Sequence, residues 1–373
     1  MDFQSLPTTP AYVFDLQIFK RNLEILANLK ARSHCQALYS IKALPLMYLL
    51  TLARDYIDGF SVSSLFEARL AREVLAGQGS IHLTTPGLRA NEIDELAQIC
   101  THLSFNSLGQ WQRFSSDRSA SWGVRINPKL SYGSDPRFDP CRFASKLGVD
   151  IHEIAQQGLP AGLEGLQCHT IFSATNFEPL LQTVKTLRQH FGETLASLKW
   201  INLGGGYLFE QINDLKPMIR LIQSLQDDYG LQVFIEPGKS MVGQAGFLIS
   251  SVVDTFISDG QHIAVLDTAI NHHPEVFEYQ RAPDLMAHKQ GAPYPTTLVG
   301  SSCLAGDIFG DYHFERPLQC SDRVVFKNVG AYSLIKANRF NGYNLPDVYT
   351  LDTEQFTLLK HYSYEEYRQQ WAC

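Results

Sequence analysis

The sequence predicts an α/β plus β fold, in which a (β/α)8 barrel is followed by an antiparallel β domain. Two observations predict it. Eight short apolar runs alternate with helical stretches over the first two thirds of the 373 residues. Past Gly238 the helical periodicity ends, and strand-like runs follow one another with Gly, Pro and Asp between them. Alternating strands and helices indicate parallel strands, and eight such units close a barrel.

The eight apolar runs have the length of buried strands, and the segments between them, such as residues 64–75 and 178–191, have helical spacing. The predicted barrel strands are residues 37–41, 59–62, 81–84, 103–105, 122–126, 163–168, 199–203 and 232–235. We therefore expect a barrel over residues 16–240.

The predicted β domain comprises residues 1–15 and 241–373. Its strand-like runs are residues 247–253, 262–266, 296–299, 323–326 and the region of 349–351. The short run at residues 11–15 precedes the first barrel helix, and we expect it to pair with this domain.

Charge and composition exclude several partners. The formal net charge is −7 with no basic tract, so we expect neither nucleic acid nor a membrane as a partner. No apolar run approaches the roughly 20 residues of a membrane span, and the N-terminus lacks the pattern of a signal peptide. The seven cysteines are scattered without metal-binding spacing. This distribution indicates reduced thiols in a cytoplasmic protein and no metal site.

Lys42 directly follows the first predicted barrel strand. The chemistry of (β/α)8 barrels gathers at the carboxyl ends of the strands. A desolvated lysine there has a lowered pKa and can act as an amine nucleophile toward an aldehyde. Taken alone, an ordinary lysine with its charge in water is the better explanation.

Three further strand ends carry groups that a cofactor needs. His169 follows the sixth run and can stack on a ring, and Glu236 ends the eighth run and can hold a proton on a heteroaromatic nitrogen. The glycines at 204–206 follow the seventh run and let the backbone approach a phosphate. Each feature has an ordinary alternative: a core histidine, a salt-bridged glutamate or a tight turn. Together with Lys42, however, they favour one cofactor with an aldehyde, a ring nitrogen and a phosphate.

The β domain supplies a second cluster. The loop at 300–307 is rich in small residues and carries the thiol of Cys303 and the carboxylate of Asp307. Such a thiol can deliver a proton to a carbanion, although a cysteine buried in a glycine turn is an equal alternative. Tyr332 offers a phenol that can bond a phosphate oxygen.

These residues match a known family over essentially the whole chain. The motifs are Tyr39-Ser40-Ile41-Lys42-Ala43, His169, the glycine triplet, Glu236-Pro237-Gly238, the Cys303 loop and Gly330-Ala331-Tyr332. Their order resembles the fold-type III pyridoxal-phosphate decarboxylases, the alanine racemase-like enzymes that include ornithine and diaminopimelate decarboxylases. Within that group the chain resembles carboxynorspermidine/carboxyspermidine decarboxylases most. The motifs that carry this closer resemblance are Cys303-Leu304-Ala305-Gly306-Asp307, His273-Pro274-Glu275-Val276-Phe277-Glu278 and Phe340-Asn341-Gly342.

The resemblance implies a pyridoxal 5'-phosphate enzyme that decarboxylates a basic, polyamine-like amino acid. The substrate that it implies is carboxynorspermidine or carboxyspermidine, in polyamine biosynthesis. Lys42 would carry the cofactor as a Schiff base, and Cys303 would reprotonate the α-carbon. His169 would stack on the ring, and Glu236 would pair with its nitrogen. The other implied cofactor contacts are Gly204, Gly205, Gly206, Gly238, Tyr332 and Arg125. The implied carboxylates for the distal amines are Asp307, Glu275 and Glu278. A homodimer with shared active sites is also implied, with the Cys303 loop coming from the second subunit.

Three departures from the family pattern affect the substrate end. His169 is followed by Thr170-Ile171-Phe172-Ser173 in place of a Cys-Glu pair. The acidic stretch has His272 and His273 at its start and Arg281 at its end, and the segment 333–339 is basic. Two alternatives therefore stay open. One is a decarboxylase of another carboxy-aminopropyl or diamino acid substrate, and the other is an amino-acid racemase with the same barrel and cofactor.

Overall fold

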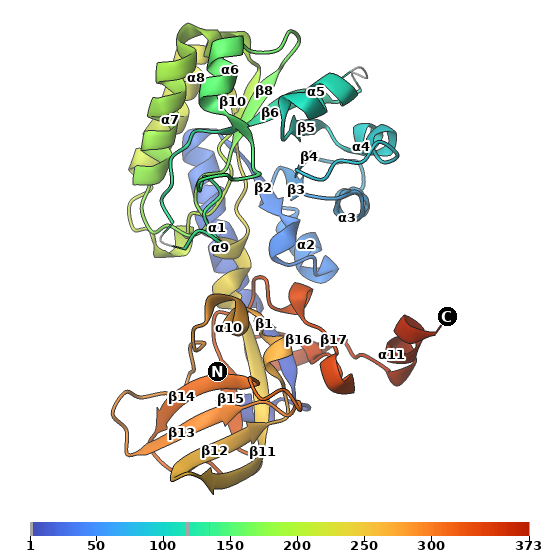
Figure 1. Ribbon diagram of the computed structural model, residues 1–373, viewed down its shortest axis with the longest axis vertical. Helices are drawn as coiled ribbons and strands as arrows, with labels where there is room; N and C mark the ends of the chain where they lie inside the picture. The colour runs from blue at the N-terminus through green and yellow to red at the C-terminus, as the bar shows by residue number, and fades with distance from the viewer. Residues whose placement is uncertain (1–2, 116–118, 134, 373) are drawn as a thin grey trace. The chain divides into compact units, whose positions relative to one another are not determined.

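The computed structural model describes residues 3–115, 119–133 and 135–372, and it divides into two compact units (Figure 1). One unit is Asn22–Ser240, and the other combines the segments on either side of it. The predicted fold class is confirmed, because one unit is a barrel of parallel strands and the other is built on a sheet. The division falls within α1 (Leu16–Ser33), whereas the sequence predicted it just before this helix.

Eight parallel strands form the closed barrel. Each strand pairs in parallel with the next, and β10 returns to β2. The strands are β2 (Gln36–Ser40), β3 (Gly59–Val62), β4 (Ser80–Thr85), β5 (His102–Phe105), β6 (Ser121–Asn127), β8 (Gly165–Cys168), β9 (Trp200–Asn202) and β10 (Gln232–Ile235). All eight correspond to the predicted apolar runs. The short strand β7 (Val149–Asp150) pairs with the end of β6.

Helices connect the barrel strands, as the helical spacing predicts. They are α1, α2 (Met47–Ala53), α3 (Leu65–Leu75), α4 (Ile93–Ile99), α5 (Leu108–Phe114), α6 (Ile151–Gln157), α7 (Glu178–Phe191) and α8 (Lys216–Tyr229), and α9 (Lys239–Val242) follows β10. Both α7 and α8 have a proline in the first turn and a glycine directly after the last residue. These are the residues that favour the start and the end of a helix.

Aromatic side chains fill the barrel interior near the amino ends of the strands. Trp200 packs with Leu38 and Phe234, and His82 stacks on His102 with ring centroids 3.9 Å apart. Alternate residues of a strand face the same side, so side chains two positions further along β9 and β10 also face the interior. Those side chains lie nearer the carboxyl ends, where the candidate site is found.

The second unit is built on a mixed sheet. Its strands are β1 (Ala11–Asp15), β11 (Gly246–Ser258), β12 (Gln261–Leu266), β13 (Tyr294–Val299), β14 (Ile308–Phe314), β15 (Arg323–Phe326), β16 (Asp347–Asp352) and β17 (Gln355–Lys360). As expected, β1 joins this sheet, between β11 and β16. The pairings of β1 with β16 and of β12 with β13 are parallel, so the sheet is not purely antiparallel as predicted.

Two short helices accompany this sheet, α10 (Glu275–Tyr279) and α11 (Tyr364–Trp371). The side chain of Ser363 accepts a hydrogen bond from the N–H of Glu366 and so caps α11. Phe3 and Leu6 pack with residues of β1, β11, β15 and β16 to form a hydrophobic core. Among the described residues, no helix is both long and apolar enough to cross a membrane.

Candidate active site

Lys42 lies in a single 3₁₀ turn, Ile41–Ala43, directly after β2. The turn is tied to the end of β10, because the N–H of Ser40 donates to the carbonyl of Pro237 at 2.9 Å. Protein atoms around the Lys42 ammonium lower its pKa by desolvation, while the nearby Glu236 carboxylate opposes this shift. The side chain nevertheless remains accessible to solvent. Lys42 is therefore an amine that loses its proton more easily than a surface lysine and that a small molecule can still reach.

Glu236 is a buried carboxylate at the end of β10, with 7% of its surface exposed. The side-chain N–H of Asn202 donates to Glu236 Oε1 at 2.8 Å, and the Glu236 backbone N–H donates to the carbonyl of Gly204 at 2.7 Å. Asn202 Oδ1 also accepts from the Gly204 N–H at 2.9 Å. Asn202 therefore links the carboxylate to the glycine triplet. The sequence analysis missed it because it lies inside an apolar run.

His169 and the glycine triplet form one structural group. The Gly205 N–H donates to His169 Nδ1 at 3.1 Å. Burial lowers the pKa of His169 well below its ordinary value, and the neighbouring Lys42 and Arg125 lower it further. The imidazole is therefore neutral at pH 7, with its proton on Nε2.

The glycines are required by close packing. A Cβ on Gly204 would lie 2.5 Å from the carbonyl of Cys168, and one on Gly205 would lie 2.0 Å from the carbonyl of Glu236. Gly206 meets the carbonyl of Ile171 in the same way, at 2.1 Å. Gly238, the last residue of the Glu236-Pro237-Gly238 motif, is less constrained, because a Cβ there would lie 3.1 Å from the Cβ atoms of Ala43 and Ser40. The triplet thus places backbone without side chains at the strand ends beside His169 and Glu236.

Arg125 lies at the end of β6 and is 8% exposed. Its Nη2 donates to the carbonyl of His169 at 3.4 Å, and the charge of Glu236 opposes the effect of burial on its pKa. Two buried amide atoms near these strand ends, Gln167 Oε1 and Asn127 Nδ2, have no hydrogen-bond partner among the described residues. Buried polar atoms in such a state are normally satisfied by a ligand or water.

Glu67 is a second carboxylate near Lys42 that the sequence analysis missed. It lies in the first turn of α3, and its Oε2 accepts from the N–H of Ser63 at 2.6 Å. Burial raises the pKa of Glu67, while the N–H of Ser63 and the charge of Lys42 lower it. The pattern Ser64-Leu65-Phe66-Glu67 is that of a capping box, so the sequence alone indicates only a helix start.

These groups fit pyridoxal 5'-phosphate. The cofactor requires an amine for its aldehyde, a carboxylate for its ring nitrogen and backbone donors for its phosphate. The carboxyl ends of the barrel strands bring together Lys42, Glu236, His169 and the glycine triplet, and the unsatisfied amide of Gln167 leaves a polar group for a ligand. In the same range of described residues, no cluster of His, Cys, Asp or Glu has the makings of a metal site.

The other unit holds the Cys303 loop. Cys303 is an exposed free thiol. Asp307 is 3% exposed, and its carboxylate accepts from the N–H of Ile270 at 2.7 Å, the N–H of Ser302 at 2.9 Å and the hydroxyl of Ser302 at 2.6 Å. Asp307 therefore faces its own loop. The buried carboxylate thus holds the backbone next to Cys303, and its expected role as a substrate ligand stays a prediction.

A second group in this unit surrounds Tyr332. Glu275 is buried and accepts from the hydroxyl of Tyr279 at 2.6 Å. Glu278 forms an ion pair of 2.6 Å with Lys336, whose ammonium lies 5.5 Å from the centre of the Tyr332 ring. Burial raises the pKa of Tyr332 to about 12, and the charge of Glu275 contributes. Lys336 belongs to the basic segment that departs from the family pattern. Its ion pair with Glu278 balances its charge within the unit.

The two histidines before α10 carry no charge at neutral pH. Burial lowers the pKa of both His272 and His273 to about 4. The hydroxyl of Thr268 lies 2.9 Å from His272 Nδ1, and the ring of His273 packs edge-on against Phe326. These two histidines therefore add no positive charge near the acidic stretch, whereas Arg281 at its end does.

A barrel with a reactive lysine at its carboxyl end, joined to a sheet domain with a thiol loop, defines a pyridoxal-phosphate enzyme of the barrel type. The family model described as "Pyridoxal-dependent decarboxylase, C-terminal sheet domain" matches residues 11–330. The chain belongs to this family and is a pyridoxal-phosphate-dependent decarboxylase. Membership sets aside the racemase alternative.

Three relatives are similar over nearly their whole length. The carboxynorspermidine/carboxyspermidine decarboxylase of Campylobacter jejuni is 30% identical over 96% of this chain and 97% of its own. The carboxyaminopropylagmatine decarboxylase of Synechocystis is 33% identical over 98% of this chain and 95% of its own. The crystal structure of carboxynorspermidine decarboxylase from Campylobacter jejuni, complexed with norspermidine, has a TM-score of 0.89. It is 28% identical and covers 97% of this chain and 100% of the other.

Proposed function

We propose that this decarboxylase removes the α-carboxylate of carboxynorspermidine and carboxyspermidine, giving norspermidine and spermidine in polyamine biosynthesis. The observation that carries the proposal is the similarity to the Campylobacter jejuni enzyme, which extends over both chains in sequence and in structure. The compact chain length matches as well, since the norspermidine complex is covered completely.

The barrel residues serve the cofactor. Lys42 would provide the amine that attaches the cofactor's aldehyde, and its lowered pKa makes the neutral form more available than in a surface lysine. Glu236, oriented by Asn202, holds the proton on the ring nitrogen. His169 would face the ring in its neutral form, and the glycine triplet with Tyr332 would hold the phosphate. The bound cofactor supplies an electron sink for the pair of electrons left at the α-carbon when carbon dioxide leaves.

Cys303 completes the reaction by giving its thiol proton to the α-carbon. The thiolate that remains recovers a proton from water, and Lys42 would hold the cofactor again once the amine product has left. Asp307 keeps the loop of this thiol in place through Ser302. In this arrangement Arg125 orders the carbonyl of His169 beside the cofactor.

Carboxylates of α10 provide the partners for the cationic amines of the substrate. Glu275 is buried, and Glu278 is partly exposed and paired with Lys336. Secondary and primary amines are protonated at pH 7, so a polyamine requires such partners. Because Lys336 already neutralises Glu278, Glu275 is the stronger of the two candidates.

A second candidate substrate is carboxyaminopropylagmatine. The Synechocystis enzyme with that name is 33% identical to this chain over nearly its full length. This substrate shares the carboxy-aminopropyl end, where the chemistry occurs, but ends in a guanidinium group. The cofactor side of the site therefore serves both substrates, and the residues around α10 decide between them.

The test is a comparison of kcat/KM for carbon dioxide release from four compounds: carboxynorspermidine, carboxyspermidine, carboxyaminopropylagmatine and diaminopimelate. We expect one of the first two to exceed the others by at least about tenfold, or about 1.4 kcal/mol. A preference of that size for carboxyaminopropylagmatine would establish the second candidate instead. A preference for diaminopimelate would contradict both.

We further propose a cytoplasmic homodimer in which each active site combines Lys42 of one chain with Cys303 of the other. The family resemblance supports this assembly, and the two residues lie in different units of the chain. The cytoplasmic location is supported by the chemistry of Cys303, because a proton-donating thiol must stay reduced.

A further inference from the structure

The backbone N–H of Cys303 is held by a side chain 38 residues further along the chain. It donates to Asn341 Oδ1 at 2.8 Å. The preceding N–H, of Ser302, donates to Asp307. The backbone N–H groups of Ser302 and Cys303 are therefore held by two different side chains. This arrangement limits the directions in which the Cys303 thiol can point.

Asn341 itself adopts a backbone conformation that few residues tolerate. Its φ of 56° lies in the left-handed region, within the turn Phe340–Gly342. Glycine and asparagine enter this region most easily, and aspartate follows. Asparagine combines this tolerance with a side-chain oxygen that can reach the Cys303 amide, whereas glycine offers only the backbone.

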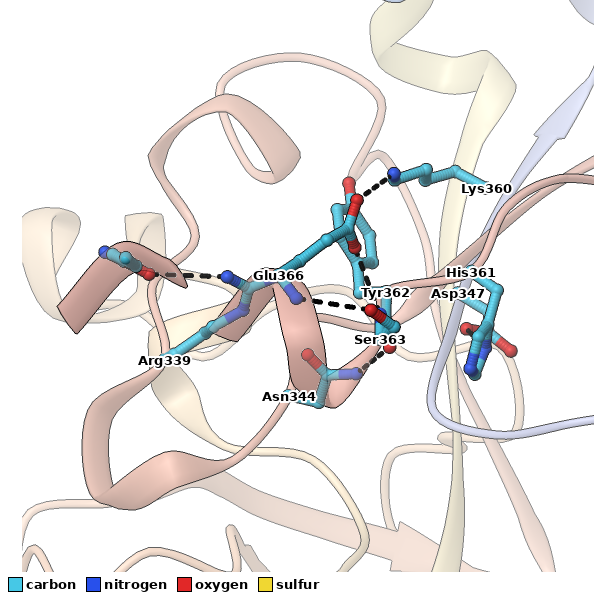
Figure 2. Close-up of polar contacts among 9 residues, drawn as sticks. Arg339, Asn344, Asp347, Lys360, His361, Tyr362, Ser363 and Glu366 are labelled. Atoms are coloured by element: carbon cyan, nitrogen blue, oxygen red, sulfur yellow. Dashed lines mark hydrogen bonds and ion pairs between the residues drawn. The ribbon is translucent and has the colours of Figure 1, made fainter. Parts of the chain in front are cut away.

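The C-terminal segment, residues 360–370, supports the turn that carries Asn341 (Figure 2). Arg339 Nη1 donates to Gln370 Oε1 at 3.3 Å, and its guanidinium lies 5.5 Å from the centre of the Tyr362 ring. On the other side of the turn, Asn344 Nδ2 donates to the carbonyl of Tyr362 at 2.5 Å.

The same segment is fixed in turn to the sheet. The Lys360 ammonium lies 5.3 Å from the Tyr362 ring and is bonded to Glu366. Figure 2 shows that these contacts converge on the short stretch between β17 and α11. Each exposed contact is weak alone, but together they restrict the residues on both sides of Asn341.

We propose that Asn341 is a positioning residue for the decarboxylation: it fixes the Cys303 backbone so that the thiol proton reaches the α-carbon. The proposal rests on the function proposed for Cys303 as proton donor. Asn341 acts through Cys303, so its loss affects the protonation step and leaves substrate binding almost unchanged. The C-terminal segment thereby contributes to catalysis without touching the substrate.

The experiment compares Asn341→Gly with Asn341→Asp in the holoenzyme. Asn341→Gly keeps the left-handed backbone and removes the acceptor, so we expect kcat to fall about fivefold to tenfold, the effect of one hydrogen bond. KM should change less than about twofold, because no substrate contact is lost. Asn341→Asp retains an acceptor oxygen and should restore kcat to near the wild-type value.

Asn328→Gly is the matched control. Asn328 also has a left-handed backbone, with φ of 61°, but its side chain donates to Asp284 at 2.8 Å and does not contact the Cys303 loop. The kcat of the Asn328→Gly enzyme should equal that of the wild type. A second variant, Arg339→Ala, leaves Asn341 in place but removes the contacts to Gln370 and Tyr362, and we expect a smaller fall in kcat.

A double-mutant cycle separates positioning from a general structural role. In a Cys303→Ala background, Asn341→Gly should have no further effect on kcat. Additive losses, or a wild-type kcat for Asn341→Gly, would overturn the positioning role. If Cys303→Ala alone kept the wild-type kcat, the proton-donor role of Cys303 would fail instead, so the two failures are distinguishable.

Discussion

The charge of Lys42 depends on several side chains with opposing effects. Desolvation by the surrounding protein lowers its pKa, and Arg125 acts in the same direction. Glu236 and Glu67 raise it. The lysine must lose its proton before it can attack an aldehyde, so these neighbours set the pH at which the cofactor is attached.

We predict that Glu67→Gln makes cofactor attachment possible at lower pH. The rate of attachment to the apoenzyme rises with pH as Lys42 deprotonates. Removing the negative charge of Glu67 lowers the Lys42 pKa further, so the midpoint should move to lower pH. The visible absorbance of the attached cofactor measures the rate. Glu73→Gln, an exposed carboxylate on the same helix, is the control, and a midpoint that stays or rises for Glu67→Gln would contradict the prediction.

Among single residues, the sequence predicted those with unusual chemistry and missed those that support them. Lys42 and Glu236 lie directly after apolar runs, which marks them as strand ends. Asn202 and Glu67 carry no such mark, because one interrupts an apolar run and the other completes a helix cap. The burial of Asp307 in its own loop is likewise a tertiary contact that spacing cannot show.

The barrel strands depend on a tight aromatic layer around Trp200. A Cβ on Gly165 would lie 2.0 Å from Trp200 Cδ2, and one on Gly123 would lie 2.3 Å from its Cη2. These two glycines on β6 and β8 therefore make room for the indole inside the barrel. The Trp200 N–H donates to the hydroxyl of Ser121 at 2.8 Å, which fixes its orientation.

We predict that Gly165→Ala destabilises the fold by about 1–3 kcal/mol, the usual cost of overpacking a core. Denaturant unfolding of the apoenzyme measures the loss. Combining it with Trp200→Leu should recover part of the stability, because the smaller side chain leaves space for the methyl group. Gly109→Ala is the control, since a Cβ there meets only Ser107 Oγ at 3.9 Å. Equal stability of Gly165→Ala and wild type would show that the indole can move away.

The stacked His82 and His102 give the barrel a pH-dependent stability. Burial lowers the pKa of His102 from 6.5 to about 4 and the pKa of His82 well below 6.5. Both are neutral in the folded and unfolded states above pH 6.5. Between that pH and about 4 the unfolded chain takes up protons that the folded chain does not, so stability falls as the pH falls.

The expected slope is at most about 1.4 kcal/mol per pH unit for each histidine. The free energy of unfolding measured from pH 7 downward should decline less steeply in the double variant His82→Asn with His102→Asn. The exposed His34→Asn should keep the wild-type slope. An unchanged slope in the double variant would mean that these rings do not control the acid sensitivity.

Elements buried on both faces were predictable, and exposed ones were not. Each barrel strand contains an apolar run that is largely buried, as expected of parallel strands covered by helices. By contrast, β14 and β17 were missed. β14 carries Gly310, Asp311 and His313 in its seven residues, and β17 has no buried side chain. β11 was predicted only over its first half, because the residues from 254 onward are exposed and mix polar with apolar side chains.

At the scale of the whole molecule, the chain separates the cofactor lysine from the thiol. Lys42 belongs to the unit Asn22–Ser240, and Cys303 belongs to the other unit. The sequence placed the boundary near residue 240 because the helical periodicity ends there. The proposed dimer would depend on surfaces that no pattern within one chain describes.

We predict that inactive subunits complement one another. In an equal mixture of Lys42→Ala and Cys303→Ala chains, half of the randomly formed dimers are mixed, and one of their two sites has both native residues. The activity should therefore reach about a quarter of the wild-type value after subunit exchange. Exchange is verified with two affinity tags. Activity no higher than the average of the two separate variants, once exchange is proven, would contradict the shared site.

The central claim is that Lys42-dependent decarboxylation converts a carboxy-aminopropyl polyamine into the corresponding polyamine. The most direct measurement incubates the cofactor-loaded enzyme with carboxynorspermidine and quantifies carbon dioxide and norspermidine together. We expect one norspermidine for each carbon dioxide with the wild type, and neither product with Lys42→Ala. Carbon dioxide without norspermidine, or undiminished turnover by Lys42→Ala, would contradict it.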